Sequence, residues 1–304
     1  MRASLTALLD AANATGCAVP AFNVFGHEDA LGAVRAAEAR GAPAILATNR
    51  ETVEHYGLRG IVAMLATLAE EARVPVCVHL DHCHDVELAK RAVDAGYDSV
   101  MYDGSSLSLD ENVAATAEVV AHAHAAGVDV EGEIGSVAYD ARDNRGREHV
   151  RHELTEPDAA RAFADSSGVD AVAVSIGNVH RLREPTARLD FDRLERIARA
   201  VDRPLVVHGA SGIPHDRLAR LAATQVAKLN VGTALRRAFA ASLRASLAAR
   251  PDEIDRLALF ADTIPAVGEE AGRWLERLGT AAAGPSLMSV PSRPFRALDP
   301  FGPR

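Results

Sequence analysis

The chain has 304 residues, which is enough for one large α/β barrel or two ordinary domains, and its 4% aromatic content requires an aliphatic core. The formal net charge is -9 with no long block of one sign, so nothing indicates nucleic-acid binding. Because no stretch suits a membrane span or a signal peptide, and the three cysteines form no disulfide-like pattern, we expect a reduced, cytoplasmic enzyme.

Eight short apolar runs alternate with amphipathic helical segments along the chain. This alternation predicts a parallel sheet covered by helices, and eight repeats within about 250 residues favour a closed (β/α)8 TIM barrel. An open doubly wound sheet would carry a GxGxxG fingerprint after its first strand, and AFNVFGHEDA lacks one. The expected strands are, in chain order, 18–24, 42–49, 75–82, 99–104, 129–135, 171–180, 204–211 and 226–233.

Two segments depart from this repeat. Residues 137–152 form a long charged stretch after the fifth strand, of the length that usually makes a lid or a spacer. Residues 284–304 carry five prolines, so we expect a tail that is neither regular helix nor central strand. The expected organisation is therefore a single barrel domain with C-terminal helices over 1–283, followed by the tail.

Three of the predicted strands end in histidine, at His82, His180 and His208. Because the active site of a barrel lies at the C-terminal ends of its strands, these rings are expected to meet in one pocket. Three imidazoles can hold one divalent metal and leave a position open for a substrate. Zn²⁺ suits such ligands, with Co²⁺, Fe²⁺ or Mn²⁺ as alternatives, and three unrelated structural histidines are the competing interpretation.

Carboxylates and amides stand at further strand ends. Asp81, next to His82, could act as a general acid or base, or could orient an imidazole from behind. Asp103 and Glu133 could hold a second, looser cation or orient the ligands. The first strand ends at Asn23, which we expect to contact the substrate.

The last two strands end in small residues, HGASG at 208–212 and NVGT at 230–233. Small residues expose backbone N–H groups, and the helix that follows NVGT adds the positive end of its dipole. The loops after strands seven and eight are the usual phosphate site of barrels, so we expect phosphate binding there. Ordinary tight turns are the alternative.

Together these motifs resemble the class II, metal-dependent fructose-bisphosphate/tagatose-bisphosphate aldolase family. The resemblance spans roughly residues 5–250 with motif order and spacing kept throughout. The matching stretches are AFNV (21–24), VHLDH (78–82), AVDAGYDSVMYDGSSLSLDENV (92–113), VEGEIG (130–135), VDAVAVSIGNVH (169–180), PLVVHGASGIP (204–214) and KLNVGTALRRAF (228–239).

The resemblance implies reversible aldol cleavage of a ketose 1-phosphate, or a related substrate, through a zinc-stabilised enediolate, in a homo-oligomer of two or four copies. It implies that the three histidines bind zinc and that Asp81 exchanges a proton with the aldehyde-derived hydroxyl. Asp103 and Glu133 match a second metal site. The segments that bind dihydroxyacetone phosphate, with a monovalent cation near its phosphate, match Gly209, Ala210, Ser211, Asn230, Val231, Gly232 and Thr233.

Three departures from the family pattern concern the substrate. Arg181 stands where glycine usually follows the second histidine, and it could narrow the phosphate pocket or bind an anion as a fork. The loop after VEGEIG reads SVAYDARDNRG and lacks the usual glycine pair, so Asp140 or Asp143 would have to supply the loop base. The segment LATNRE lacks the usual serine. We therefore expect an aldolase of a specialised pathway rather than one for fructose 1,6-bisphosphate. A zinc-dependent isomerase or epimerase, and a non-catalytic sugar-phosphate-binding homologue, are the alternatives.

Overall fold

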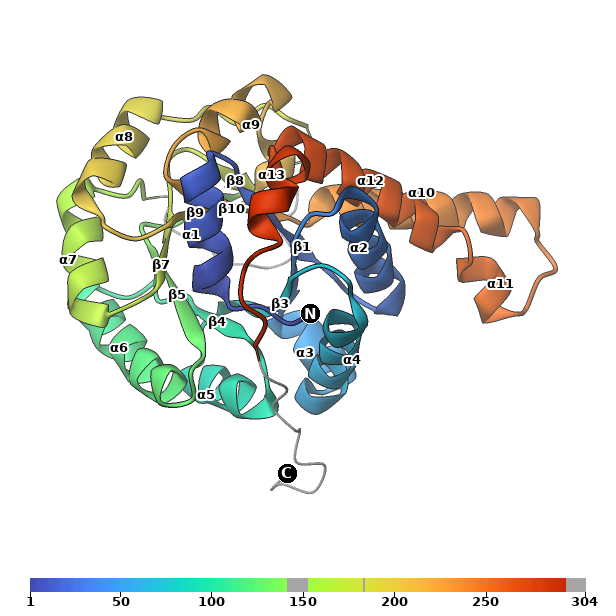
Figure 1. Ribbon diagram of the computed structural model, residues 1–304, viewed down its shortest axis with the longest axis horizontal. Coiled ribbons are helices and arrows are strands. Elements are labelled where there is room, and N and C mark those ends of the chain that lie inside the picture. The colour runs from blue at the N-terminus through green and yellow to red at the C-terminus, as the bar shows by residue number, and fades with distance from the viewer. Residues whose placement is uncertain (141–152, 183, 294–304) are drawn as a thin grey trace.

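Eight parallel strands close into a barrel in the computed structural model, which describes residues 1–140, 153–182 and 184–293 (Figure 1). Every barrel strand pairs with its neighbours in chain order, and β1 pairs with β10 to close the ring. The (β/α)8 TIM barrel is confirmed. Its strands are β1 (Val19–Asn23), β2 (Ala44–Asn49), β3 (Val76–Cys83), β4 (Ser99–Tyr102), β5 (Asp129–Ile134), β7 (Ala171–Val174), β9 (Leu205–Val207) and β10 (Val226–Val231).

Helices surround the barrel and cover the outer faces of its strands (Figure 1). Their starts follow simple capping chemistry: the Asp85 and Ser108 side chains accept hydrogen bonds from the first backbone N–H groups of the helices that they precede. The helices are α1 (Leu5–Thr15), α2 (His27–Arg40), α3 (Arg50–Tyr56), α4 (Leu58–Glu71), α5 (Val86–Ala95), α6 (Leu109–Ala125), α7 (Pro157–Ser167), α8 (Phe191–Ala200), α9 (His215–Ala222), α10 (Thr233–Ala249), α11 (Arg256–Phe260), α12 (Thr263–Arg277) and α13 (Thr280–Leu287).

The barrel interior is apolar at one end and polar at the other. At the N-terminal end of the strands, α1 packs Leu5, Leu8 and Leu9 against small inward-facing side chains such as Ala47 and Cys77. Alternation along the strands then brings polar side chains inward farther up. This arrangement closes one end with a packed core and leaves the other available for a site.

The sixth predicted strand, 171–180, is wrong in its extent. β7 ends at Val174, and Val179–His180 forms a separate short strand, β8, which pairs with β6 (Ala138–Tyr139) above the barrel. The chain turns at Gly177, where φ is +97° and a Cβ atom would lie 2.2 Å from the Arg188 carbonyl oxygen, so glycine is required. His180 therefore reaches the barrel mouth from a loop and not from a barrel strand.

The expectation that the segment from 284 onward contains no regular helix is also wrong at its start. Helix α13 runs to Leu287 and includes Pro285. The preceding Gly284 has no Cβ to clash with the proline ring, and it packs so closely on the Gly41 carbonyl that a Cβ would lie 2.4 Å away. Ser292 then pairs with Ala3, and residues 294–304 lie outside the described part.

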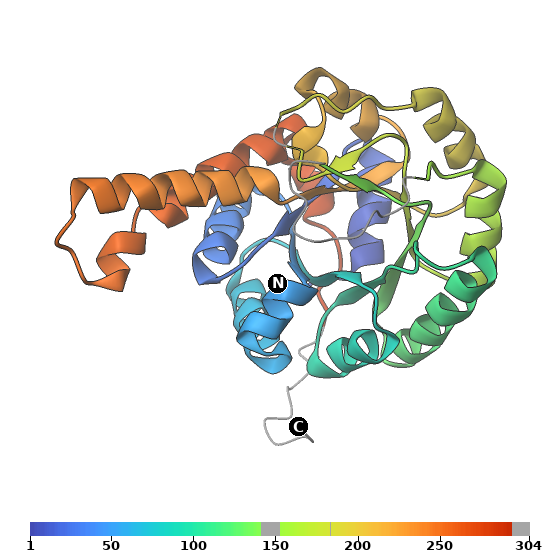
Figure 2. The ribbon, with the colours of Figure 1, turned by 180° about the vertical axis from the view of Figure 1, so that it is seen from behind.

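Helices α10 and α11 form an arm that projects to one side of the barrel (Figures 1 and 2). Only Leu235 and Ser246 of α10 are buried, whereas Ile254 and Leu257 near the tip are 94% and 79% exposed. Helix α12 returns from the arm and packs along α2. Within the described ranges, no helix has the length and apolar character needed to span a membrane.

Candidate active site

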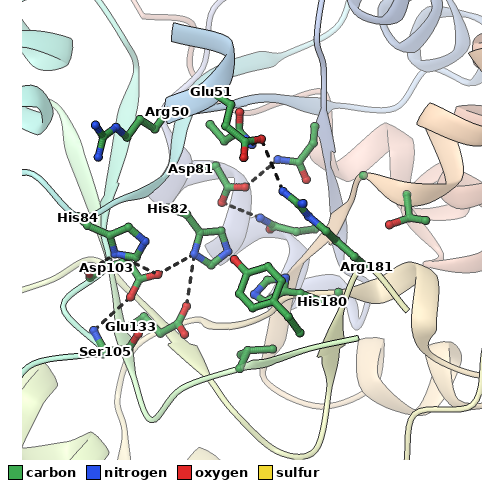
Figure 3. A pocket seen from close by; sticks show the side chains of 18 of the residues that line it. Arg50, Glu51, Asp81, His82, His84, Asp103, Ser105, Glu133, His180 and Arg181 are labelled. Atoms are coloured by element: carbon green, nitrogen blue, oxygen red, sulfur yellow. Dashed lines mark hydrogen bonds and ion pairs between the residues drawn. The ribbon is translucent and has the colours of Figure 1, made fainter. Parts of the chain in front are cut away.

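A cavity of about 490 Å³ opens at the C-terminal ends of the barrel strands (Figure 3). It gathers residues from loops that are far apart in the sequence, as barrel active sites do. Of the predicted site residues, those that line it are Asn23, Asp81, His82, Asp103, Glu133, His180, Arg181, Gly209, Ser211, Asn230, Gly232 and Thr233.

The three histidines meet at this cavity: His82 and His180 line it, and His208 is buried directly behind them. The ring centroids of His82 and His180 lie 4.8 Å apart, those of His82 and His208 4.5 Å, and those of His180 and His208 5.7 Å. One ring nitrogen from each lies within 4.8 Å of the others, which is the spacing of a shared metal site. The structure thus brings together the trio that the sequence singled out.

An unusual backbone conformation lets Asp81 and His82 both face the cavity, although neighbouring residues of a strand point to opposite sides. His82 has φ +48°, and the pairing of β3 with β4 shifts register between Leu80 and Cys83. Such a bulge turns an additional side chain toward the same face. A non-glycine residue in this region costs on the order of 1 kcal/mol or more, so the rest of the site must hold it in place.

Carboxylates fix the orientation of two of the imidazoles. His82 Nδ1 lies 2.8 Å from Asp103 Oδ2, and His208 Nε2 lies 3.0 Å from Glu131 Oε1. Because an ionised carboxylate only accepts, these ring nitrogens donate, so that in the neutral form of each ring the opposite nitrogen is left as an acceptor. His82 Nε2 and His208 Nδ1 are indeed buried and have no hydrogen-bond partner among the described residues, and neither has Glu133 Oε2. Buried acceptors that converge without donors fit a divalent cation.

The neighbouring charges favour the ligand form of His180. Burial and the positive charges near it, first that of His82, lower the pKa of His180 well below its usual value, so its ring is neutral. Burial and the nearby Asp103 raise the pKa of the Glu133 carboxyl. A neutral imidazole such as that of His180, next to a carboxylate, is a ligand that suits Zn²⁺.

Asp81 is held by two amide groups. Its Oδ2 accepts a hydrogen bond of 2.7 Å from Asn23 Nδ2, and its Oδ1 accepts one of 2.8 Å from Asn230 Nδ2. Burial raises the pKa of Asp81, but the positive charges of His82 and Lys228 outweigh burial and bring it below the ordinary value. Asp81 is therefore ionised at neutral pH, as a group that accepts a proton must be.

A buried charged layer lies directly beneath the histidines. Lys228 Nζ donates a 2.7 Å hydrogen bond to Glu131 Oε2, and both side chains are fully buried. Burial raises the pKa of Glu131, but the Lys228 ammonium and the His208 ring outweigh it and lower the pKa to about 2. Sequence reasoning missed this pair, although a lysine inside the apolar run VAKLNV and a glutamate inside VEGEI were visible signals.

The predicted phosphate segments form one wall of the cavity. Gly209 has φ +72°, and a Cβ on it would lie 2.5 Å from the Val179 carbonyl oxygen. Ser211 Oγ accepts a hydrogen bond from the Ala234 backbone N–H, at the first turn of α10. Small residues thus leave room beside a helix N-terminus, which suits an anion. Two predicted contacts, Ala210 and Val231, are buried and are not among the residues that line the cavity.

Arg181 crosses the cavity mouth from the β8 side. Its backbone is left-handed, with φ +57°, the conformation for which glycine is favoured. Its guanidinium lies 3.5 Å from Glu51 Oε2 and 5.8 Å from the centre of the Tyr139 ring (Figure 3). Tyr139 in turn stacks on His180 with ring centroids 4.8 Å apart. Arg181 is thus directed at the opening of the cavity.

Not every predicted residue reaches the site. Asp140 is buried, its backbone N–H donates to the His180 carbonyl oxygen, and it is not among the described residues that line the cavity. Asp143 lies outside the described residues. Cavity residues that sequence reasoning missed include Tyr139, Arg50, Glu51 and His84. The charged pair Arg50–Glu51 directly after the barrel strand β2 was the available signal for two of them.

Comparison with known proteins decides the family. The family model described as "Fructose-bisphosphate aldolase class-II" matches residues 3–283. The chain therefore belongs to the class II fructose-bisphosphate aldolase family. As a class II aldolase it is a carbon–carbon lyase, and the resemblance drawn from its motifs is confirmed.

Individual class II aldolases agree with this assignment. A curated relative, the sulfofructosephosphate aldolase of Alkalicoccus urumqiensis, is 35% identical over 246 residues, which are 81% of this chain and 85% of the relative. The crystal structure of the YdjI aldolase from Escherichia coli is 30% identical, with a TM-score of 0.80, and covers 93% of this chain and 100% of its own. Fructose-bisphosphate aldolase from Campylobacter jejuni, at 21% identity, shares the fold with a TM-score of 0.75 over 92% of this chain and 96% of its own.

Proposed function

We propose that this class II aldolase uses a divalent metal to cleave a ketose 1-phosphate reversibly into dihydroxyacetone phosphate and an aldehyde. The observation that carries the proposal is a set of buried atoms without a hydrogen-bond partner, His82 Nε2, His208 Nδ1 and Glu133 Oε2, which lie beside His180 and the Asp81 carboxylate. We propose Zn²⁺ as the ion, with Co²⁺, Fe²⁺ or Mn²⁺ as alternatives, because three imidazoles suit it best. When bound, the ion would supply a Lewis acid for the substrate carbonyl.

Asp81 is the proposed acid and base. In the cleavage direction its carboxylate accepts the proton of the substrate hydroxyl that becomes the aldehyde oxygen. The carbon–carbon bond then breaks, and its electron pair remains on the three-carbon phosphate fragment until that fragment takes up a proton. Asn23 and Asn230 hold both carboxylate oxygens in place, so the proton transfer needs little reorganisation.

The substrate phosphate is proposed to lie against Gly209, Ser211, Gly232 and Thr233, where small residues border the start of α10. A monovalent cation beside the phosphate belongs to the same proposal. We propose that Asp103 orients His82, because Asp103 Oδ2 lies 2.8 Å from His82 Nδ1. A second cation at Asp103 and Glu133 is the alternative, because the two carboxylates and His82 also lie close enough to share an ion.

We propose that the substrate carries an anionic group at its aldehyde end, held by Arg181. The name of the relative, sulfofructosephosphate aldolase, denotes a fructose that carries both a sulfo group and a phosphate. In this chain the guanidinium of Arg181 lies at the cavity mouth, where the side chain is only 14% exposed. A sulfonate or carboxylate would gain two parallel hydrogen bonds from such a fork. A specialised substrate of this kind is favoured over fructose 1,6-bisphosphate.

The projecting arm supports a homo-oligomer, dimer or tetramer. Ile254 and Leu257 are large apolar side chains that the single chain leaves exposed near the tip of the arm. Exposed apolar side chains on a projecting element are typical of surfaces that bind another protein. A second copy of the chain is the partner that we propose.

The test is a cleavage assay with metal control. Metal-stripped protein should be inactive, Zn²⁺ should restore release of an aldehyde from a ketose 1-phosphate, and His208→Ala should lose the metal. An isomerase or epimerase would leave the carbon count of the sugar unchanged, and a non-catalytic homologue would bind sugar phosphate without turnover. Full activity in the metal-free protein would refute the proposal.

A further inference from the structure

A charged pair lies in the barrel interior behind His208, and the proposed chemistry does not use it directly. Lys228 and Glu131 come from strands β10 and β5, their charged atoms lie 2.7 Å apart, and neither side chain is exposed. We propose that Lys228 and Glu131 are positioning residues that fix the tautomer and orientation of His208 for metal binding. The inference rests on the proposed metal role of His208.

The argument begins with the direction of the hydrogen bonds. The Lys228 ammonium can only donate, so the Glu131 carboxylate accepts from it at Oε2. The other carboxylate oxygen, Oε1, lies 3.0 Å from His208 Nε2, which must therefore carry the proton. In the neutral ring, Nδ1 then has the free lone pair, and this is the nitrogen that lies 3.1 Å from Glu133 Oε2 in the cavity.

Stability alone does not account for such a pair. Replacing a buried ion pair by apolar side chains of similar volume is often neutral or stabilising, because both charges must be removed from water. The interior around it is mostly apolar, with Ala171 and Val206 nearby; the further polar group is the buried His79, whose Nε2 lies 3.7 Å from Glu131 Oε2 and whose Nδ1 contacts Ser99 Oγ. The carboxylate between an ammonium and a ligand ring serves instead to orient that ring, as outer partners of metal-bound histidines do.

A second buried ion pair, at the opposite end of the barrel, provides a matched control. Arg2 Nη2 lies 2.9 Å from Asp98 Oδ1, and both residues are buried. This pair is not in contact with a cavity histidine: its further hydrogen bonds go to the backbone at Gly96 and Val78. Breaking it should destabilise the fold in the same way without touching the metal ligands.

The experiment measures Zn²⁺ affinity on metal-stripped protein, by competition with a chromophoric chelator, and the His208 tautomer by nitrogen-15 NMR. Lys228→Met should weaken Zn²⁺ binding by about 10- to 100-fold and populate both tautomers. Arg2→Met should lower Tm while Zn²⁺ affinity stays within about twofold, since only the fold is perturbed. Equal Zn²⁺ losses in the two variants, or an unchanged Zn²⁺ affinity and tautomer in Lys228→Met, would overturn the inference.

A matched pair of double variants keeps the test decisive if Lys228→Met does not fold. Glu131→Gln/Lys228→Met retains an oxygen that can accept the His208 Nε2–H, whereas Glu131→Leu/Lys228→Met removes the acceptor, and neither leaves an unpaired charge. The first should bind Zn²⁺ at least about tenfold more tightly than the second. Equal affinities would refute the positioning role. His208→Ala separates the two proposals: if it binds Zn²⁺ as the wild type does, the metal site itself is wrong.

Discussion

Replacing Arg181 with glycine separates the function of this side chain from its effect on stability. The backbone there has φ +57°, so glycine relieves about 1 kcal/mol of strain. The lost contacts are together worth about 1–2 kcal/mol, because the one with Glu51 spans 3.5 Å to a side chain that is 55% exposed and the one with the Tyr139 ring spans 5.8 Å. The two terms oppose each other, so Arg181→Gly should change the free energy of unfolding by no more than about 1 kcal/mol.

The effect on catalysis should be far larger and should depend on the substrate. A hydrogen-bonded guanidinium contributes about 1.5–3 kcal/mol to holding an anion, which corresponds to about 10- to 150-fold in kcat/KM. That loss is expected for condensation of dihydroxyacetone phosphate with an aldehyde that carries a sulfonate or carboxylate. A neutral aldehyde of the same length should lose no more than about threefold, since it makes no charged contact.

The assay compares kcat/KM for the charged and the neutral aldehyde in wild type, Arg181→Gly and Glu51→Gln. Glu51→Gln removes a competing carboxylate from the guanidinium, so it should improve the use of the anionic aldehyde while Arg181→Gly impairs it. Proton exchange on dihydroxyacetone phosphate alone should be unchanged in both variants. If Arg181→Gly slowed reaction of both aldehydes equally, the reasoning about the anionic end would be refuted.

Three further outcomes are expected. Asp81→Asn should lower kcat by about 10²- to 10⁴-fold while Zn²⁺ affinity is retained, because a proton acceptor is lost and no ligand; loss of the metal with the activity would contradict this. Asp29→Asn should stabilise the protein above pH 6 but not near pH 4, as followed by denaturant unfolding. Burial raises the pKa of Asp29 from 3.8 to about 6. The wild-type protein therefore loses up to about 3 kcal/mol of its free energy of unfolding as the pH rises through 6, because the buried carboxyl must ionise. A difference between the two proteins that did not depend on pH would argue against the shift. Gly232→Ala should raise KM for the phosphate substrate, because its Cβ would lie 3.1 Å from Asn23 Oδ1 and crowd the cavity wall.

The barrel could be predicted because it depends on a repeated pattern. Alternation of apolar runs and amphipathic helices, with glycine after several helices, is a local signal that recurs eight times. The histidine trio followed from the rule that barrel sites lie at strand ends. Yet the rule placed His180 on a strand that ends six residues earlier, at Val174, and only the turn at Gly177 returns it to the site.

The partners of the site residues could not be predicted in the same way. Lys228 and Glu131 are 97 positions apart, and their contact depends on strand order and register across the barrel interior. The link between Arg181 and Glu51 likewise depends on two loops meeting above the barrel mouth. The spacing of residues in the sequence predicts the periodicity of each strand, but it does not predict how far apart the loops of different strands lie.

Backbone strain in the described part of the chain supports a functional interpretation of Arg181. His82 and Arg181 are the two non-glycine residues there with positive φ, and both line the cavity. At His82 the strained backbone has a structural purpose, because it turns the imidazole toward the other two histidines. At Arg181 glycine would relieve the strain, at the cost of the contacts that arginine makes with Glu51 and with the Tyr139 ring. A side chain kept in a conformation that disfavours it, at the opening of an active site, is best explained by what it binds.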